Sequence, residues 1–113
     1  MRVIIAGSRD ISPSIEQIDK VVAELGWIIT TVLCGAARGA DTAGRVWAEY
    51  KSIPVAMYPA DWSRHGKSAG YKRNENMAFN ADALIAFWDG QSKGTQHMIN
   101  IATRMNLKVK VVQ

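Results

Sequence analysis

The sequence predicts a single α/β domain over residues 1–113, a three-layer Rossmann-like fold built on a mostly parallel sheet of five strands. Short apolar runs rich in β-branched residues alternate with stretches whose apolar residues recur at helical spacing. This is the order expected for parallel strands joined by helices. Glycines and polar residues also concentrate after the strands, which places ligand binding at one edge of the sheet.

The first strand is expected at residues 2–7, where RVIIAG is nearly continuous apolar sequence, as burial on both faces requires. A helix should follow, with Ser12 as its N-cap and Pro13 at the first helical position. Gly26 can end this helix. The apolar stripe that predicts it consists of Ile15, Ile18, Val22 and Leu25.

The second strand is expected at residues 27–35 and the third at 53–58, because both runs are again almost wholly apolar. The helix between them is predicted by a stripe at helical spacing. That stripe consists of Ala43, Val46, Trp47 and Tyr50.

A more polar helix is expected over residues 68–80, followed by a fourth apolar strand at 83–88. The last helix should begin near Thr95, and its stripe is Met98, Ile101, Ala102 and Met105. The final run, 108–113, alternates valine with lysine, which is typical of an edge or half-exposed strand.

Composition limits the class of protein. With 48% hydrophobic and 21% charged residues, the chain can bury a core and disorder is not expected. A net charge of +4 tolerates anionic partners without requiring them, and the basic residues are scattered. One cysteine, Cys34, excludes an internal disulfide and favours a reducing cytoplasm. We expect neither a signal peptide nor a membrane partner, because no apolar run approaches the roughly 20 residues that span a bilayer.

Seven of the nine glycines lie in or beside four polar loops that follow strands, at residues 7–10, 35–42, 61–76 and 89–96. Glycine lets backbone approach a ligand closely, and lysine with the N–H groups of a new helix favours anions. The connections at the opposite edge, such as ELGW and KSIP, are short and plain. Binding or chemistry is therefore expected in one crevice formed by these loops.

Each feature also has a purely structural interpretation. Glycine loops after strands are common turns, Asp41 can cap a helix, and Arg73 with Glu75 can be a solvated helix start. Cys34 is interpreted as a core residue, and so are Trp47 and Trp88. Trp62 lies in a polar loop and is the better candidate for stacking on a ligand. The two histidines are too few and too far apart in sequence to predict a metal site.

The motifs AGSRD, CGAARGADTAG, PADWSRHGKSAGYKRNENM and AFWDGQSKGTQHM resemble, in order and spacing, the YspA-related branch of the SLOG superfamily. The resemblance covers nearly the whole chain and implies a Rossmann-like fold that binds nucleotides or nucleotide-derived ligands. The superfamily includes the LOG phosphoribohydrolases, which release bases from nucleotides. It also includes the DNA-processing protein A family. The stretch CGAARGAD of this chain resembles the glycine motif of that family.

The resemblance implies roles for individual residues. The loop 89–95 aligns with the LOG motif that receives phosphate at a helix N-terminus, Arg73 occupies the place of a substrate-positioning arginine, and Asp41 can accept from ribose hydroxyls. The expected ligand-binding residues are Gly7, Ser8, Arg9, Gly35, Arg38, Gly39, Asp41, Trp62, Lys67, Arg73, Asn74, Asp89, Gly90, Ser92, Lys93, Gly94 and Thr95.

One departure bears on catalysis. LOG enzymes carry a glutamate where this chain has Met98, so the resemblance does not extend to their arrangement for cleavage. The first hypothesis is a binding module without a cofactor that senses or sequesters a nucleotide or ADP-ribose-like ligand. The second is an N-glycosidase acting on a nucleoside monophosphate or NAD-like substrate, with Arg73, Glu75 and Asp41 as catalytic residues. Single-stranded DNA binding, with Trp62 and Tyr71 stacking on bases, is a weaker alternative. Relatives of this kind assemble, so a homo-oligomer is expected.

Overall fold

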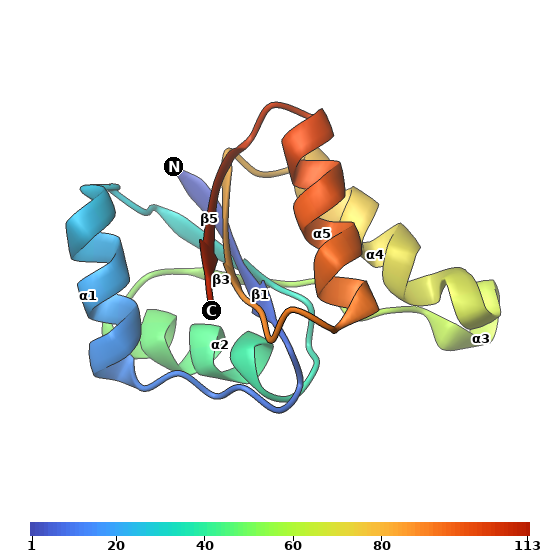
Figure 1. The fold of residues 1–113 in the computed structure, drawn as a ribbon, viewed down its shortest axis with the longest axis horizontal. Coiled ribbons are helices and arrows are strands. Elements are labelled where there is room, and N and C mark those ends of the chain that lie inside the picture. The colour runs from blue at the N-terminus through green and yellow to red at the C-terminus, as the bar shows by residue number, and fades with distance from the viewer.

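The computed structural model describes residues 1–113 and contains one five-stranded sheet in the order β3-β2-β1-β4-β5 (Figure 1). All four strand pairings are parallel, so the predicted fold class is confirmed and the sheet is fully parallel. The strands are β1 (Arg2–Gly7), β2 (Thr31–Cys34), β3 (Val55–Met57), β4 (Ala83–Phe87) and β5 (Lys108–Val112).

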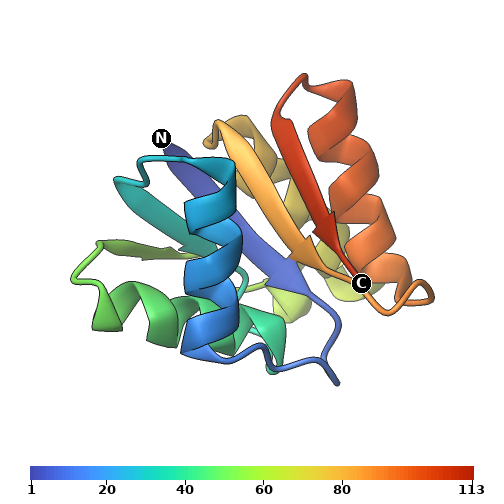
Figure 2. The same ribbon diagram turned by 60° about the vertical axis from the view of Figure 1, so that its left-hand side comes forward.

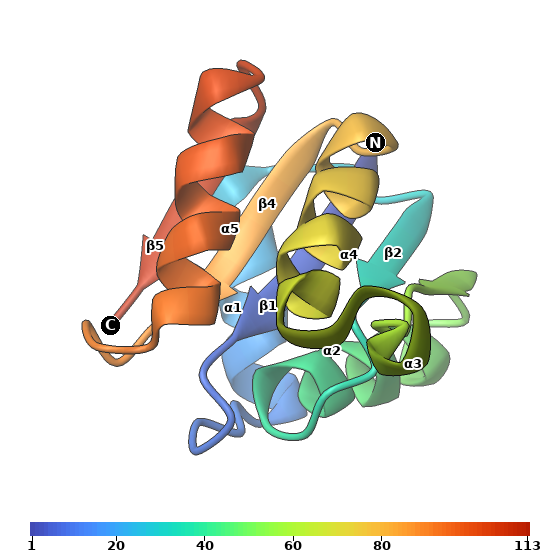
Figure 3. The same cartoon turned by 90° about the vertical axis from the view of Figure 1, so that its right-hand side faces the viewer.

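Helices cover both faces of the sheet. One face carries α1 (Ile15–Leu25) and α2 (Ala40–Tyr50), as Figure 2 shows. The other carries α4 (Ala69–Phe79) and α5 (Lys93–Arg104), which lie side by side in Figure 3. A short helix, α3 (Trp62–His65), and a 3₁₀ turn, η1 (Gly66–Ser68), lead into α4.

Side chains alternate across the sheet and build two cores. Val3 and Ile5 of β1 pack toward α1 and α2, in a cluster that includes Trp47. Ile4 and Ala6 pack toward α4 and α5 in a second cluster. The apolar runs of β1, β2 and β4 are therefore strands buried on both faces, as expected. The run of β3 is only partly buried, because β3 lies at the edge of the sheet.

The strand order also fixes where a ligand can bind. The chain runs outward from β1 through β2 to β3, then returns to place β4 on the other side of β1. The loops that follow β1 and β4 therefore leave the sheet in opposite directions and open a crevice between them. Most residues of the candidate site belong to the end of β1 or to a loop or helix start at this edge.

The start of α1 differs from the prediction. The N-cap is Ser14 rather than Ser12, and the helix begins at Ile15, so Pro13 precedes it. The Ser14 Oγ accepts from the Gln17 N–H at 3.1 Å, and the Gln17 Oε1 accepts from the Ser14 N–H at 2.9 Å. This reciprocal capping box satisfies two backbone donors. A cap at Ser12 would place Ile15 at the third helical position, and Ile15 has no side-chain acceptor to return the bond.

Two other elements are shorter than predicted. Residues 27–30 lie outside β2, because they form the connection that pairs with the chain start, where the Thr30 N–H donates to the Met1 carbonyl at 2.8 Å. Likewise β3 covers three residues of the run 53–58. The α3 and η1 segments were not predicted, and α5 begins at Lys93, two residues before Thr95.

The predicted core residues separate into two groups. Cys34 and Trp47 are fully buried, as expected. Trp88 is half-buried, and its indole N–H donates to the Ser92 carbonyl at 3.1 Å. Three stripe residues, Val46, Tyr50 and Met105, are exposed. Tyr50 is the last residue of α2 and Met105 is the C-cap of α5, so both lie at helix ends.

Candidate functional site

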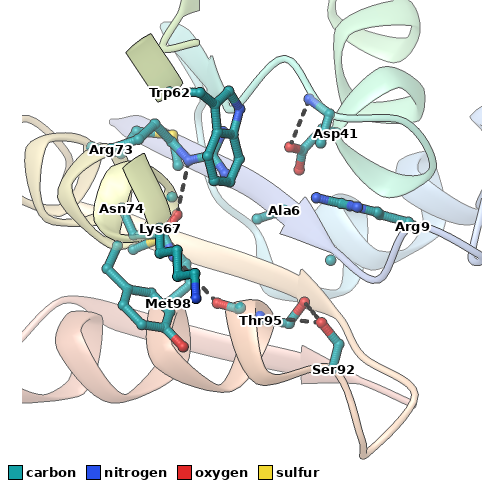
Figure 4. A pocket seen from close by; sticks show the side chains of 16 residues that line it. Ala6, Arg9, Asp41, Trp62, Lys67, Arg73, Asn74, Ser92, Thr95 and Met98 are labelled. Carbon is teal, nitrogen blue, oxygen red and sulfur yellow. Dashed lines mark hydrogen bonds between the residues drawn. The ribbon is translucent and has the colours of Figure 1, made fainter. Parts of the chain in front are cut away.

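A cavity of about 230 Å³ lies at the carboxyl edge of β1 and β4 (Figure 4). All four predicted loops contribute to its wall, together with the first turns of α2, α4 and α5. Ten of the predicted site residues line it: Gly7, Arg9, Asp41, Trp62, Lys67, Arg73, Asn74, Ser92, Gly94 and Thr95. The structure therefore brings together residues that are up to 88 positions apart in sequence, Gly7 to Thr95.

Asp41 is the carboxylate of this cavity. It lies in the first turn of α2 and is only 6% exposed, and its Oδ2 accepts from the Ala37 N–H at 3.2 Å. Burial raises the pKa of Asp41 to about 6, although the Ala37 N–H and the nearby Arg73 and Arg9 favour the ionised form. Its Oδ1 makes no hydrogen bond to the protein and is not sealed from the cavity, so it can accept from a ligand hydroxyl.

Arg73 of α4 is fixed by its protein partners. One guanidinium nitrogen, Nη1, donates to the carbonyls of Gly35 and Tyr58, and Nε donates to Asn74 Oδ1 at 3.0 Å. Asn74 in turn donates through Nδ2 to the Gly94 carbonyl at 3.2 Å. This chain of hydrogen bonds connects the loop after β2 to the start of α5, so the two walls of the cavity are fixed relative to each other.

The cavity is positively charged. Arg9, Lys67 and Arg73 line it, whereas Asp41 is its one acidic residue. Figure 4 shows Arg9 and Arg73 pointing into the same space from opposite sides. Trp62 is 56% exposed at the mouth, with its ring close above Gly70. An anionic ligand with a ring that stacks on Trp62 would fit this arrangement.

The loop before α5 is partly occupied by its own side chains. Asp89 Oδ1 accepts from the backbone N–H groups of Gln91 and Ser92, both at 2.8 Å, and these bonds lower the pKa of Asp89. Ser92 caps α5, and its Oγ accepts from the Thr95 N–H at 3.4 Å. The N–H groups of the first helical residues, 93 and 94, have no intrahelical partner and remain for a ligand.

A second cavity of about 360 Å³ adjoins the first. The two share four residues, namely Arg9, Ala37, Trp62 and Arg73. Gly35 and Arg38 line this outer cavity, so two more predicted residues belong to the same crevice. Arg38 is largely exposed and lies 3.7 Å from the Asp10 carboxylate.

Several predicted residues have structural positions instead. A Cβ at Gly39 would lie 2.5 Å from the Arg9 carbonyl oxygen, and its φ of +78° also favours glycine. Ser8 is buried, and its Oγ accepts from the Asp89 N–H at 3.2 Å. Gly90, with a φ of +82°, turns the chain after β4.

The structure does not bring two other predicted residues into either cavity. Glu75 is exposed on α4 and Lys93 is exposed at the start of α5. Glu75 lies between Asn74 and Met77, which do face the cavity, but helical rotation turns position 75 away from them. The carboxylate that the cavity holds is Asp41 alone.

Sequence reasoning missed part of the lining, namely Ala6, Ala37, Gly70, Met77 and Met98. Tyr71, which was considered only for stacking on DNA bases, also lines the cavity. Helical spacing could have found two of these, because Gly70 and Met77 lie four before and three after Asn74. Met98 is 1% exposed and forms an apolar part of the wall. Its thioether carries no negative charge, so Met98 cannot stabilise a cationic transition state as the LOG glutamate does.

Two further observations concern metal binding and membrane insertion. No group of three or more His, Cys, Asp or Glu side chains is arranged to hold a metal ion. None of the helices combines the length and the apolar character that crossing a bilayer requires.

Known proteins resemble this chain in sequence and in structure. The sequence model described as the YspA, cpYpsA-related SLOG family matches residues 1–65. Gene 61 protein of Mycobacterium phage D29 is 38% identical over 84 residues, which are 69% of this chain and 67% of the phage protein. The X-ray structure of DNA processing protein A (DprA) from Streptococcus pneumoniae superposes with a TM-score of 0.79 and 18% identity. That match covers 99% of this chain, and the chain spans 50% of the DprA chain.

Proposed function

Because this chain belongs to the YspA, cpYpsA-related SLOG family, we propose that it binds a nucleotide or an ADP-ribose-like ligand in the crevice described above. The observation that carries the proposal is the convergence of Asp41, Arg9, Arg73 and the α5 N-terminus on one cavity. A carboxylate that can accept from ribose hydroxyls lies there beside cations that can hold phosphate. Met98 in place of a glutamate favours binding over turnover, so the role is that of a sensor or a sequestering protein.

Native mass spectrometry of freshly purified protein tests this proposal. We expect a mass increment that matches a nucleotide-derived molecule and that is released intact when the protein is denatured. The same spectrum measures whether the chain forms the homo-oligomer that we expect. The proposal is wrong if the protein carries no such molecule and calorimetry with a panel of nucleoside phosphates and ADP-ribose gives no heat of binding.

The second candidate is an N-glycosidase, and one observation favours it. Asp41 is a buried carboxylate in the cavity with a pKa of about 6, and such perturbed groups concentrate at catalytic sites. An oxocarbenium-like transition state needs a carboxylate nearby, and Asp41 replaces Glu75 as the residue of choice because Glu75 faces solvent.

Chromatography for free base after incubation with nucleoside monophosphates and NAD separates the two candidates. If the protein is an enzyme, Asp41→Asn should abolish multiple-turnover base release, whereas Glu75→Gln should leave the rate unchanged. If it is a binder, wild-type protein releases no base. Single-stranded DNA binding, the weakest alternative, predicts instead that oligodeoxythymidylate binds with a strong salt dependence.

A further inference from the structure

The outer cavity differs in charge from the inner one. Three arginines line it, Arg9, Arg38 and Arg73, and no carboxylate does. The ion pair of Arg38 with Asp10 has a separation of 3.7 Å, and both side chains are largely exposed. Such an exposed ion pair contributes little free energy, so Asp10 offsets little of the positive charge of the outer cavity.

The arginines at the junction of the two cavities have donors to spare. The Arg9 side chain makes no hydrogen bond or ion pair within the protein, so its five N–H groups are free. Arg73 uses Nη1 and Nε on protein acceptors, which leaves Nη2. A guanidinium held in this way presents its remaining donors in a fixed direction.

The same two arginines repel each other in the free protein. Burial lowers the pKa of Arg73, the charge of Asp41 raises it, and the charge of Arg9 lowers it. Two neighbouring guanidinium groups that share a single carboxylate are stabilised further when an anion binds between them.

The geometry points to a ligand with at least two linked phosphate groups, of the nucleoside diphosphate class, that spans both cavities. The nucleoside occupies the inner cavity, and its first phosphate lies between Arg9 and Arg73, which line both spaces. The second phosphate lies in the outer cavity within reach of Arg38. This inference rests on the proposed function and adds the number of phosphates.

The small volume of the inner cavity also supports this assignment. Its volume of about 230 Å³ is below the roughly 300 Å³ at which small-molecule sites usually begin, so a ligand larger than a mononucleotide must extend outward. The opening toward the outer cavity passes Arg9, Arg73 and Trp62. The part of a ligand that passes from one cavity to the other would therefore contact two cations and an aromatic ring. This environment suits a diphosphate.

Calorimetry with matched nucleoside mono- and diphosphates of adenine, guanine, cytosine and uracil tests the inference. For the base that binds best, wild-type protein should bind the diphosphate about tenfold more tightly than the monophosphate, as expected for one further charged contact. Arg38→Gln should remove that increment. Arg64→Gln is the matched control, because Arg64 is an exposed arginine that lines neither cavity and the substitution removes the same charge.

The outcomes separate this inference from the proposed function. If no nucleotide binds wild-type protein, the proposed function itself fails. If mono- and diphosphates bind equally and Arg38→Gln changes neither affinity, the proposed function stands and the diphosphate inference is overturned. If oligodeoxythymidylate is the probe that loses affinity in Arg38→Gln, the outer arginines contact nucleic acid and the inference is again overturned.

Discussion

Asp41 is the residue at which stability and function conflict. The residue is 6% exposed, and one carboxylate oxygen accepts a hydrogen bond from a backbone N–H. The second oxygen has no protein partner. Burial shifts the pKa from its ordinary 3.8 to about 6, so ionisation at neutral pH costs the folded state free energy that the unfolded chain does not lose. Residues kept despite such a cost concentrate at functional sites.

Asp41→Asn should therefore stabilise the protein at pH 7.5 by about 1–3 kcal/mol, since each unit of pKa shift corresponds to about 1.4 kcal/mol. The sign follows from proton binding. Between about pH 4 and pH 6 the folded state binds more protons than the unfolded state, so wild-type stability falls as pH rises through this window. The advantage of the variant should vanish near pH 4. Urea unfolding at both pH values measures it.

Asp10→Asn serves as the control for this comparison. Asp10 is exposed and its one ion pair is weak, so the substitution should change the free energy of unfolding by less than about 0.5 kcal/mol at either pH. If Asp41→Asn is no more stable than wild type at pH 7.5, the buried carboxylate is not destabilising and the argument for its functional role loses this support.

At the scale of elements, the start of α5 leaves few backbone N–H groups with which an anion could form hydrogen bonds. Asp89 and Ser92 already satisfy three N–H groups of the loop and first turn. Gly94, the second residue of the helix, lines the inner cavity, and a Cβ added there meets no atom within 4 Å. A side chain at position 94 can therefore be introduced without disturbing the fold.

Gly94→Asp should weaken binding of a nucleoside phosphate by at least about tenfold, because its carboxylate would enter the inner cavity, which Arg9 and Arg73 also line, and would repel the anionic ligand. It should also raise the melting temperature slightly, since an acidic residue in the first helical turn is favourable. Gly94→Asn has nearly the same shape without the charge and should lose much less affinity. Equal calorimetric affinities for the two variants would place the phosphate elsewhere.

The elements show where sequence patterns suffice and where they do not. Buried parallel strands were predicted because burial on both faces leaves a continuous apolar run, as in β1 and β4. The cap of α1 was misplaced because Ser12-Pro13 and Ser14 are both acceptable starts, and only the Gln17 side chain decides between them. The α3 helix has four residues and no apolar stripe, so periodicity gives no signal for it.

At the scale of the whole molecule, the crevice is a consequence of strand order. The loops after β1 and β4 diverge because the chain reverses its direction of travel across the sheet at this point. The sequence could predict which loops line the crevice, since their glycines and polar residues gather after strands. It could not predict that Glu75 faces solvent, which depends on the rotation of α4 about its axis, or that Arg38 belongs to an outer cavity, which depends on the turn that the loop after β2 adopts.

The buried thiol of Cys34 makes the opening of this sheet measurable. Cys34 is fully buried at the end of β2, and burial raises its pKa to about 12, so a disulfide reagent meets no reactive thiolate in the closed molecule. The reagent must then label molecules in which the sheet has opened around Cys34, and the labelling rate measures how often this opening occurs. A molecule bound in the crevice at one hundred times its Kd should slow labelling about a hundredfold. Because the chain has one cysteine, the native sequence is its own reporter of occupancy, and the assay works before the ligand's identity is known.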